Sequence, residues 1–290
     1  MEISDSLVGT TLKGHRAKFT WRDTTNYAAA VCDDNPVYFD DERQGGIFAP
    51  PMFATALTWQ VSGRIWEYLE SEDFPMQVLT SQVHYTEHFE FHRVIKPGDG
   101  ITLKGTVASI QPHKAGAHIV IRYEAFNGMD EPVFTNHTGA LLRGVTCIGE
   151  GRGGESLPDV PRGSGGETPD WEAPVAIDRL APYVYDGCTD IVFPIHTSER
   201  FAKSVGLPGV ILQGTATLAH AAREIVDREA GGDPERLKTL FCRFTSMVLP
   251  GTTIRVAARV ESSPGGKQIF FNVINGDGRK ALSPGYALIV

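Results

Sequence analysis

An internal repeat restricts the fold of this 290-residue chain more than any other feature of its sequence. The stretch VLPGTTIRVAARV in the second half closely matches VIKPGDGITLKGTVASI in the first half. A second match sets Pro36 against Pro194, so that Tyr27 falls on Tyr185. Because self-similarity at a fixed spacing indicates tandem copies of one structural unit, the sequence predicts two copies of the same fold.

The first copy begins with helical patterns. A short strand is expected in LKGHRAKFT and a short helix over residues 24–31, which end at the turn-forming DDNP. One longer helix is expected after the double proline at 50–51, because apolar residues recur there at spacings of three and four. The apolar face consists of Phe53, Leu57, Val61, Ile65, Tyr68 and Leu69.

Strands follow the helix in both copies. Over residues 77–143 the apolar period changes to two, and turn-forming stretches such as KPGDG separate the runs, which predicts an antiparallel sheet. The second copy has its own helix, which ends at Gly231 and Gly232, and three further strand-like stretches follow it. The apolar face of that helix consists of Leu218, Ala222, Ile225 and Val226.

The predicted architecture is α+β, with two tandem units that each wrap an antiparallel sheet over one helix. Residues 1–148 form the first unit and residues 171–290 the second. Residues 149–170 are rich in glycine and proline and read as a flexible linker. The GEGRGG stretch in this linker does not have the GxGxxG spacing or the strand-then-helix context of a phosphate-binding loop.

Composition excludes several classes of protein. A formal net charge of -8 gives no basis for nucleic-acid binding. No stretch approaches the roughly 18 apolar residues of a membrane span, and the N-terminus lacks the pattern of a signal peptide. We therefore expect a soluble, cytoplasmic protein. The cysteines are scattered without a CxxC pair and are expected to be reduced thiols: Cys32, Cys147, Cys188 and Cys242.

Three residues suited to proton chemistry lie close together in the second copy. Asp190 is an acid, His196 is a base near pH 7, and Gly214 opens the predicted helix. A helix N-terminus supplies unpaired N–H donors and partial positive charge, and glycine lets a substrate approach the backbone closely. Together these groups can move a proton beside a polarised carbonyl.

These residues resemble the signature of the MaoC-like, or R-specific enoyl-CoA hydratase, family of hot-dog proteins. That signature has a tyrosine, then D-x-N-P-x-H, then an H-G turn into the central helix. The first copy matches it at Tyr27, Asp33, Asn35 and Pro36, with Tyr38 in place of the histidine. The second copy matches it at Tyr185, Pro194, Ile195, His196 and Gly214. The resemblance covers nearly the whole chain as a double hot-dog.

The second copy also departs from the family pattern. Asp190 lies six residues before His196, where the family has five. Phe193 stands where asparagine is expected, and Gln213 replaces the histidine before Gly214. The first copy lacks the base altogether, so its site is expected to be degenerate, with Asp33 and Asn35 in structural roles.

The resemblance implies an enzyme that adds water to a 2-enoyl thioester, or removes it from the 3-hydroxyacyl thioester, at one site in the second copy. Asp190 and His196 would perform the acid–base steps, and an N–H near Gly214 would bind the thioester oxygen. Gln213 and Thr215 are assigned to substrate binding, and Arg200 and Lys203 to the coenzyme A phosphates. The substrate is an acyl-CoA or an acyl-carrier-protein thioester, and no cofactor and no metal are expected.

Two other functions stay open. A catalytically silent acyl-CoA-binding partner subunit is motivated by the missing histidine of the first copy and the shifted aspartate of the second. A hot-dog thioesterase is the other, whereas a serine hydrolase is disfavoured because GxSxG is absent. Pairing of two chains into a homodimer is also open. The histidines at 84, 88 and 92 do not predict a metal site, because on a strand successive members would lie about 13 Å apart.

Overall fold

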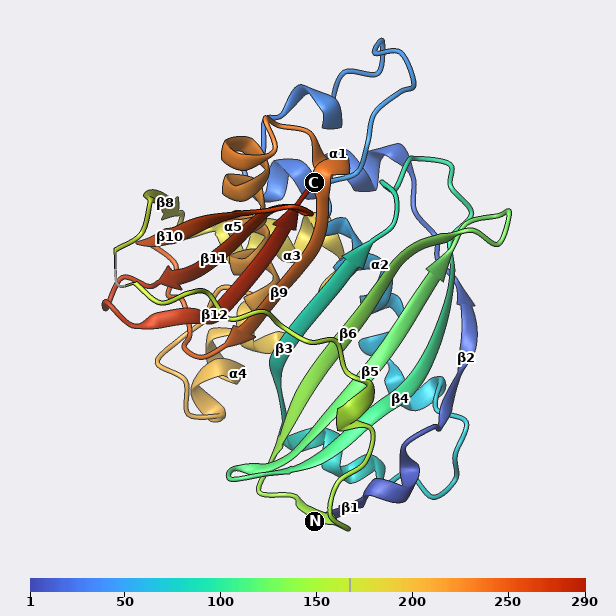
Figure 1. The fold of residues 1–290 in the computed structure, drawn as a ribbon. Helices are drawn as coiled ribbons and strands as arrows, with labels where there is room; N and C mark the ends of the chain where they lie inside the picture. The colour runs from blue at the N-terminus through green and yellow to red at the C-terminus, as the bar shows by residue number, and fades with distance from the viewer. Residues whose placement is uncertain (167) are drawn as a thin grey trace.

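The computed structural model describes residues 1–166 and 168–290. Ten strands form one continuous antiparallel sheet in the order β2-β4-β5-β6-β3-β9-β12-β11-β10-β8, with the helices gathered against one face (Figure 1). The bounds are β2 Thr11–Arg16, β3 Gln82–Phe91, β4 Thr102–His113, β5 Gly116–Phe126, β6 Pro132–Arg143, β8 Trp171–Ile177, β9 Leu237–Phe244, β10 Thr252–Ser263, β11 Gly266–Ile274 and β12 Lys280–Ile289. Short strands β1 (Glu2–Ser4) and β7 (Thr146–Ile148) pair separately.

Five α-helices lie along the described chain: α1 Trp21–Ala30, α2 Phe53–Ser62, α3 Ala181–Thr189, α4 Glu199–Ser204 and α5 Gly214–Glu229. The predicted helices near 24–31 and after Gln213 are confirmed. The prediction of one helix through Leu69 was wrong, because α2 ends at Ser62 and a 3₁₀ turn follows at Ile65–Glu67. Gly63 lies at the break, and the poor helix propensity of glycine explains the stop.

The predicted double hot-dog is confirmed. The two half-sheets join where β3 pairs with β9, and each half-sheet wraps one long helix, α2 or α5. The alignment that places Pro97-Gly98 on Pro250-Gly251 also places His88 on Phe241. His88 and Phe241 lie directly opposite each other in the β3–β9 ladder. The pair therefore lies on a local two-fold axis that relates the repeats.

Helices α1 and α3 meet across the same axis through two tyrosines. The hydroxyls of Tyr27 and Tyr185 lie 2.8 Å apart, both side chains are fully buried, and the rings pack edge to face. The Tyr27 hydroxyl also lies 3.1 Å from that of Thr55 in α2. Burial raises the pKa of Tyr185 to about 12, so both hydroxyls stay protonated and can share hydrogen bonds.

The described part of the segment between the repeats, residues 149–166, crosses the face of the sheet opposite the helices (Figure 1). Arg152 forms a backbone bridge with Ile110 of β4, and Ser164 donates to Glu261 of β10. The flexible linker expected from composition is thus held by both repeats along this part. Residue 167 of that prediction lies outside the described residues.

The sequence analysis missed strand β8. It is an edge strand that pairs only with β10 in the described sheet, and it contains Pro174. Proline is tolerated at a sheet edge because no ladder N–H is required there. Among the described residues, no helix is both long and apolar enough to cross a bilayer.

Replacing Tyr27 by phenylalanine is expected to lower the free energy of unfolding by about 1–3 kcal/mol, because it strips the buried Tyr185 hydroxyl of a partner. Chemical denaturation measures the effect. The double variant Tyr27→Phe/Tyr185→Phe should lose less than the sum of the two single variants, since both partners are then removed.

Tyr183→Phe is the matched control, because this tyrosine lies on α3 but is exposed. Two results would contradict a stabilising role for the tyrosine pair. One is a loss of unfolding free energy in Tyr183→Phe as large as that in Tyr27→Phe. The other is a loss in the double variant equal to the sum of the losses in the two single variants.

Candidate active site

His196 ends the 3₁₀ turn Pro194–His196 and is partly buried. Its Nδ1 lies 2.8 Å from the carbonyl oxygen of Ile211. Because a carbonyl can only accept a hydrogen bond, Nδ1 carries the proton and Nε2 presents a lone pair. Burial lowers the pKa of His196 to about 4, so the side chain is neutral at pH 7. The imidazole is therefore set up to accept a proton at Nε2.

Gly214 is the first residue of α5, three residues after the partner of His196. The leading N–H groups of a helix lack intrahelical acceptors and carry partial positive charge. The segment that enters the helix is anchored by the Leu212 N–H, which donates to the Val248 carbonyl at 2.9 Å. The backbone thus holds a base and a helix N-terminus side by side.

A phenylalanine ring covers Gly214. A Cβ atom added to Gly214 would lie 2.9 Å from Cε1 and 3.0 Å from Cδ1 of Phe244, which is closer than real Cβ contacts. Glycine is required here because any side chain would collide with the Phe244 ring, and not because the backbone has a positive φ. Phe244 therefore forms one wall at the helix start.

Asp190 is exposed and caps the C-terminus of α3 in the left-handed region, with φ 55°. Within the described chain, no hydrogen bond joins it to His196. One helical turn earlier, the Oδ2 atom of Asp186 is buried without a partner. Burial, followed by the charge of Asp190, raises the pKa of Asp186. Asp186 is therefore a second acidic group near the end of α3.

Sequence reasoning missed Asp186. Its only signal was its position directly after the motif tyrosine and one helical turn before Asp190. A carboxyl group at that spacing shares the helix face of the predicted acid, and so it was a second candidate for the role.

The other predicted site residues divide into a buried and an exposed pair. Gln213 is buried, its Nε2 donates to the Pro182 carbonyl at 2.9 Å, and its Oε1 has no partner among the described residues. The hydroxyl of Thr215 is likewise buried and unpartnered there. Arg200 and Lys203 are exposed on α4, and Lys203 pairs with Glu199 at 2.9 Å.

Unpartnered buried polar atoms are costly and call for an explanation. Three of them come from α3 and the start of α5: Asp186 Oδ2, Gln213 Oε1 and Thr215 Oγ1. They are the groups that a water molecule or a polar ligand in this site would satisfy.

The matching position in the first repeat has no base. Tyr38 is completely buried, and its hydroxyl has no partner in the described chain. Asn35 donates to the Gly232 carbonyl at 2.6 Å, and the Asp33 carboxylate accepts from the Asn35 N–H at 3.3 Å. Burial raises the pKa of Asp33 to about 7. These contacts fit the structural roles expected for Asp33 and Asn35.

The first repeat also lacks the glycine. The Ala49 N–H donates to the carbonyl of Ile95, and the Leu212 N–H donates to the carbonyl of Val248. The alignment of the two Pro-Gly turns places Ile95 on Val248, so Ala49 corresponds to Leu212. Pro51 therefore stands where the second repeat has Gly214. Proline has no N–H, so this site has lost a backbone donor as well as a base.

Comparison with known proteins gives matches in both halves of the chain. The model of the MaoC like domain matches residues 164–283. A second model, the FAS1-like dehydratase domain region, matches residues 6–136. Each repeat thus matches a dehydratase family separately.

Relatives match over most of the chain. It is 25% identical over 277 residues to "Probable enoyl-CoA hydratase 2" of Dictyostelium discoideum (93% of this chain, 90% of the relative). It is 26% identical to "Enoyl-CoA hydratase 2, peroxisomal" of Arabidopsis thaliana (87% of this chain, 85% of the relative). The crystal structure of a MaoC-like dehydratase from Phytophthora capsici has a similar fold, with a TM-score of 0.83, 21% identity and coverage of 99% and 98%. Residues 164–283 thus match the MaoC like domain, and the whole chain has the double hot-dog fold of proteins described as MaoC-like.

Proposed function

We propose that this protein is an enoyl-CoA hydratase that interconverts a 2-enoyl-CoA and a 3-hydroxyacyl-CoA at one site in the C-terminal repeat. The observation that carries the proposal is the fixed tautomer of His196. Its Nδ1 is held by the carbonyl of Ile211, three residues before α5 begins, and this leaves Nε2 as the basic nitrogen. Full-length relatives with hydratase names support the same reaction.

In the proposed reaction, Nε2 of His196 removes a proton from water as the water oxygen bonds to C3 of the enoyl thioester. The electron pair of the double bond moves toward the thioester oxygen, which gains enolate charge. The N–H at Gly214 and the dipole of α5 stabilise that charge. A carboxylic acid then protonates C2 and recovers its proton from His196, so that one water is added overall.

The acid is proposed to come from the pair Asp190 and Asp186. Asp190 is the residue that the family pattern nominates. Asp186 is supported by its buried Oδ2 atom, and burial, followed by the charge of Asp190, raises the pKa of its carboxyl. A like charge beside a carboxyl group favours its protonated form.

Substrate binding is proposed to use both buried and exposed groups. Gln213 and Thr215 would meet the polar thioester end, and Arg200 and Lys203 would meet the phosphates of coenzyme A. Pairing into a homodimer and a cytoplasmic location stay predictions.

Replacing His196 by glutamine is expected to lower kcat for crotonyl-CoA hydration at least about a hundredfold, because the general base is lost. Loss of the enoyl-thioester absorbance measures the rate. Asp190→Asn and Asp186→Asn, assayed alongside, identify the acid as the residue whose loss lowers kcat to a similar degree.

His92→Gln is the control, because this histidine lies outside the site and its ring Nε2 lies 3.2 Å from the Thr135 hydroxyl. If the wild-type protein binds the thioester without turning it over at any chain length, the silent-subunit function replaces this proposal. Release of free thiol would instead identify a thioesterase.

The acid limb of the pH dependence of kcat/KM is expected near pH 4. Because burial lowers the pKa of His196 to about 4, the base stays neutral down to that pH and is lost by protonation below it. Steady-state rates between pH 3.5 and 8 with a stable acyl-CoA test this. An acid limb near 6.5, the usual value for histidine, would contradict the lowering of the His196 pKa by burial.

Gly214→Ala is expected to lower kcat/KM by at least about tenfold, because the new Cβ would collide with Phe244 and displace the helix start. Gly187→Ala in α3 is the matched control, since its Cβ would meet nothing within 4 Å. The control should keep full activity and unfold at an equal or higher denaturant concentration. Unchanged activity in Gly214→Ala would remove this glycine from the proposed mechanism.

A further inference from the structure

Two exposed phenylalanines lie beside the base of the proposed active site and have no role in the chemistry described so far. Phe193 directly precedes the 3₁₀ turn that ends at His196, and the centroids of its ring and the imidazole lie 6.5 Å apart. Phe201 lies on α4, and its ring meets that of Phe193 edge to face, also at 6.5 Å. Phe193 is 41% exposed and Phe201 38%. Neighbouring apolar groups left in water mark a surface that binding can bury.

The N-terminal repeat shows that the fold does not need an aromatic residue at the position of Phe193. The alignment of the two motif prolines places Asn35 on Phe193. Asn35 serves the fold, because its side chain donates to the Gly232 carbonyl at 2.6 Å and accepts from the Val37 N–H at 3.2 Å. Phe193 can form neither of these hydrogen bonds. The exposed ring therefore lies in the repeat that keeps the base, at a position where the other repeat has a structural amide.

Phe201 is presented by a helix that has no counterpart in the described N-terminal repeat. The segment from the base position to the helix start is longer in the C-terminal repeat (196–214 against 38–51), and it contains α4. The Ser198 hydroxyl accepts from the Phe201 N–H at 3.3 Å at the start of α4, and Ala202 is completely buried. One side of α4 is thus anchored in the protein, while Phe201 stays exposed.

Helix α4 also carries Arg200 and Lys203, which are exposed and are proposed to meet the phosphates of coenzyme A. A path from the base to these cations leads over Phe193 and Phe201. In coenzyme A, the part between the thioester sulfur and the phosphates is the pantetheine arm, which contains two amides, several methylene groups and a carbon with two methyl groups. Aromatic rings along the path can bury these methyl and methylene groups.

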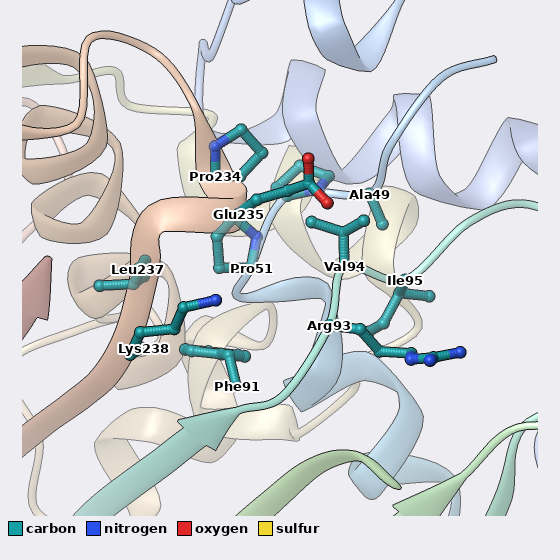
Figure 2. Close-up of a pocket in the computed structure, with 11 residues that line it drawn as sticks. Ala49, Pro51, Phe91, Arg93, Val94, Ile95, Pro234, Glu235, Leu237 and Lys238 are labelled. Carbon is teal, nitrogen blue, oxygen red and sulfur yellow. The ribbon is translucent and has the colours of Figure 1, made fainter. Parts of the chain in front are cut away.

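A second apolar space lies at the start of α2. Pro51, Phe91 and Leu237 line this small cavity, and Arg93 and Lys238 lie at its edge (Figure 2). None of its described lining residues comes from the segment that carries His196, α4 and the start of α5. The cavity belongs to the repeat without a base, so the path over Phe193 and Phe201 is the better candidate for the arm.

We propose that Phe193 and Phe201 bind the pantetheine arm of coenzyme A and determine the preference of the enzyme for the full thioester over thioesters of short thiols. The inference rests on the proposed function. The rings contact the arm and take no part in proton transfer. Burial of the arm holds the enoyl group beside Nε2 of His196, so that binding energy from a part of the substrate that does not react supports the reaction.

The test uses three crotonyl thioesters of increasing length, those of N-acetylcysteamine, pantetheine and coenzyme A. Loss of the enoyl-thioester absorbance gives kcat/KM for each. We expect wild type to prefer the pantetheine thioester over the N-acetylcysteamine thioester by at least about tenfold, since each buried methylene is worth about fourfold. In Phe193→Asn/Phe201→Ser this ratio should fall to within about threefold of one. A ratio cancels any loss of folded enzyme or damage to the base.

Phe39→Thr is the matched control. Phe39 is also 41% exposed, and it follows Tyr38 in the N-terminal repeat as Thr197 follows His196. This variant should keep the wild-type ratio. The preference for coenzyme A over pantetheine reports on the phosphates instead, and it should fall in Arg200→Gln/Lys203→Gln but not in the phenylalanine variant.

Three results would overturn the proposal. An unchanged pantetheine preference in the phenylalanine variant would show that the arm binds elsewhere, while the hydratase function would stand. A changed preference between crotonyl and octenoyl pantetheine, with the arm preference intact, would show that the rings hold the acyl chain. A wild-type protein that hydrates none of the three thioesters would remove the proposed function itself, and the inference with it.

Discussion

The pairing of β3 with β9 is the contact on which the rest of the structure depends. Each half-sheet alone would expose one of these strands as an edge with unpaired N–H and C=O groups. Their antiparallel pairing, centred on His88 and Phe241, satisfies those groups and fuses two cores into one. The same pairing brings α1 against α3 and places β3 residues beside the start of α5.

The two repeats have diverged at matching positions. In the N-terminal repeat, Tyr38 takes the place of the base and Pro51 the place of the glycine that opens the helix. The first change removes the imidazole base, and the second removes a backbone N–H donor. The exposed ring of Phe193 lies in the repeat that keeps His196 and Gly214, whereas Asn35 serves the fold at the matching position.

Much of the fold followed from the sequence because repeats and periodicity are local signals. The duplication, the two long helices and the strands β3–β6 and β9–β12 were predicted from spacing alone. The end of α2 and the edge strand β8 were not, because a helix stop at Gly63 and an edge that tolerates Pro174 depend on tertiary context. Within the site, the motif identified His196 and Gly214. Phe193 was visible only as a departure from the motif, since its exposure and its contact with Phe201 depend on how the loop folds.

The extra residue between Asp190 and His196 has a structural explanation that bears on the acid. Helix α3 ends at Thr189, and Asp190 turns the chain in the left-handed region, which aspartate tolerates better than most residues. The turn leaves the Asp190 carboxylate exposed, whereas Asp186 stays on the helix with one buried oxygen atom. Burial, followed by the charge of Asp190, raises the pKa of Asp186. The one-residue shift in the motif thus leaves two carboxyl groups, one exposed and one partly buried, as candidates for the proposed acid.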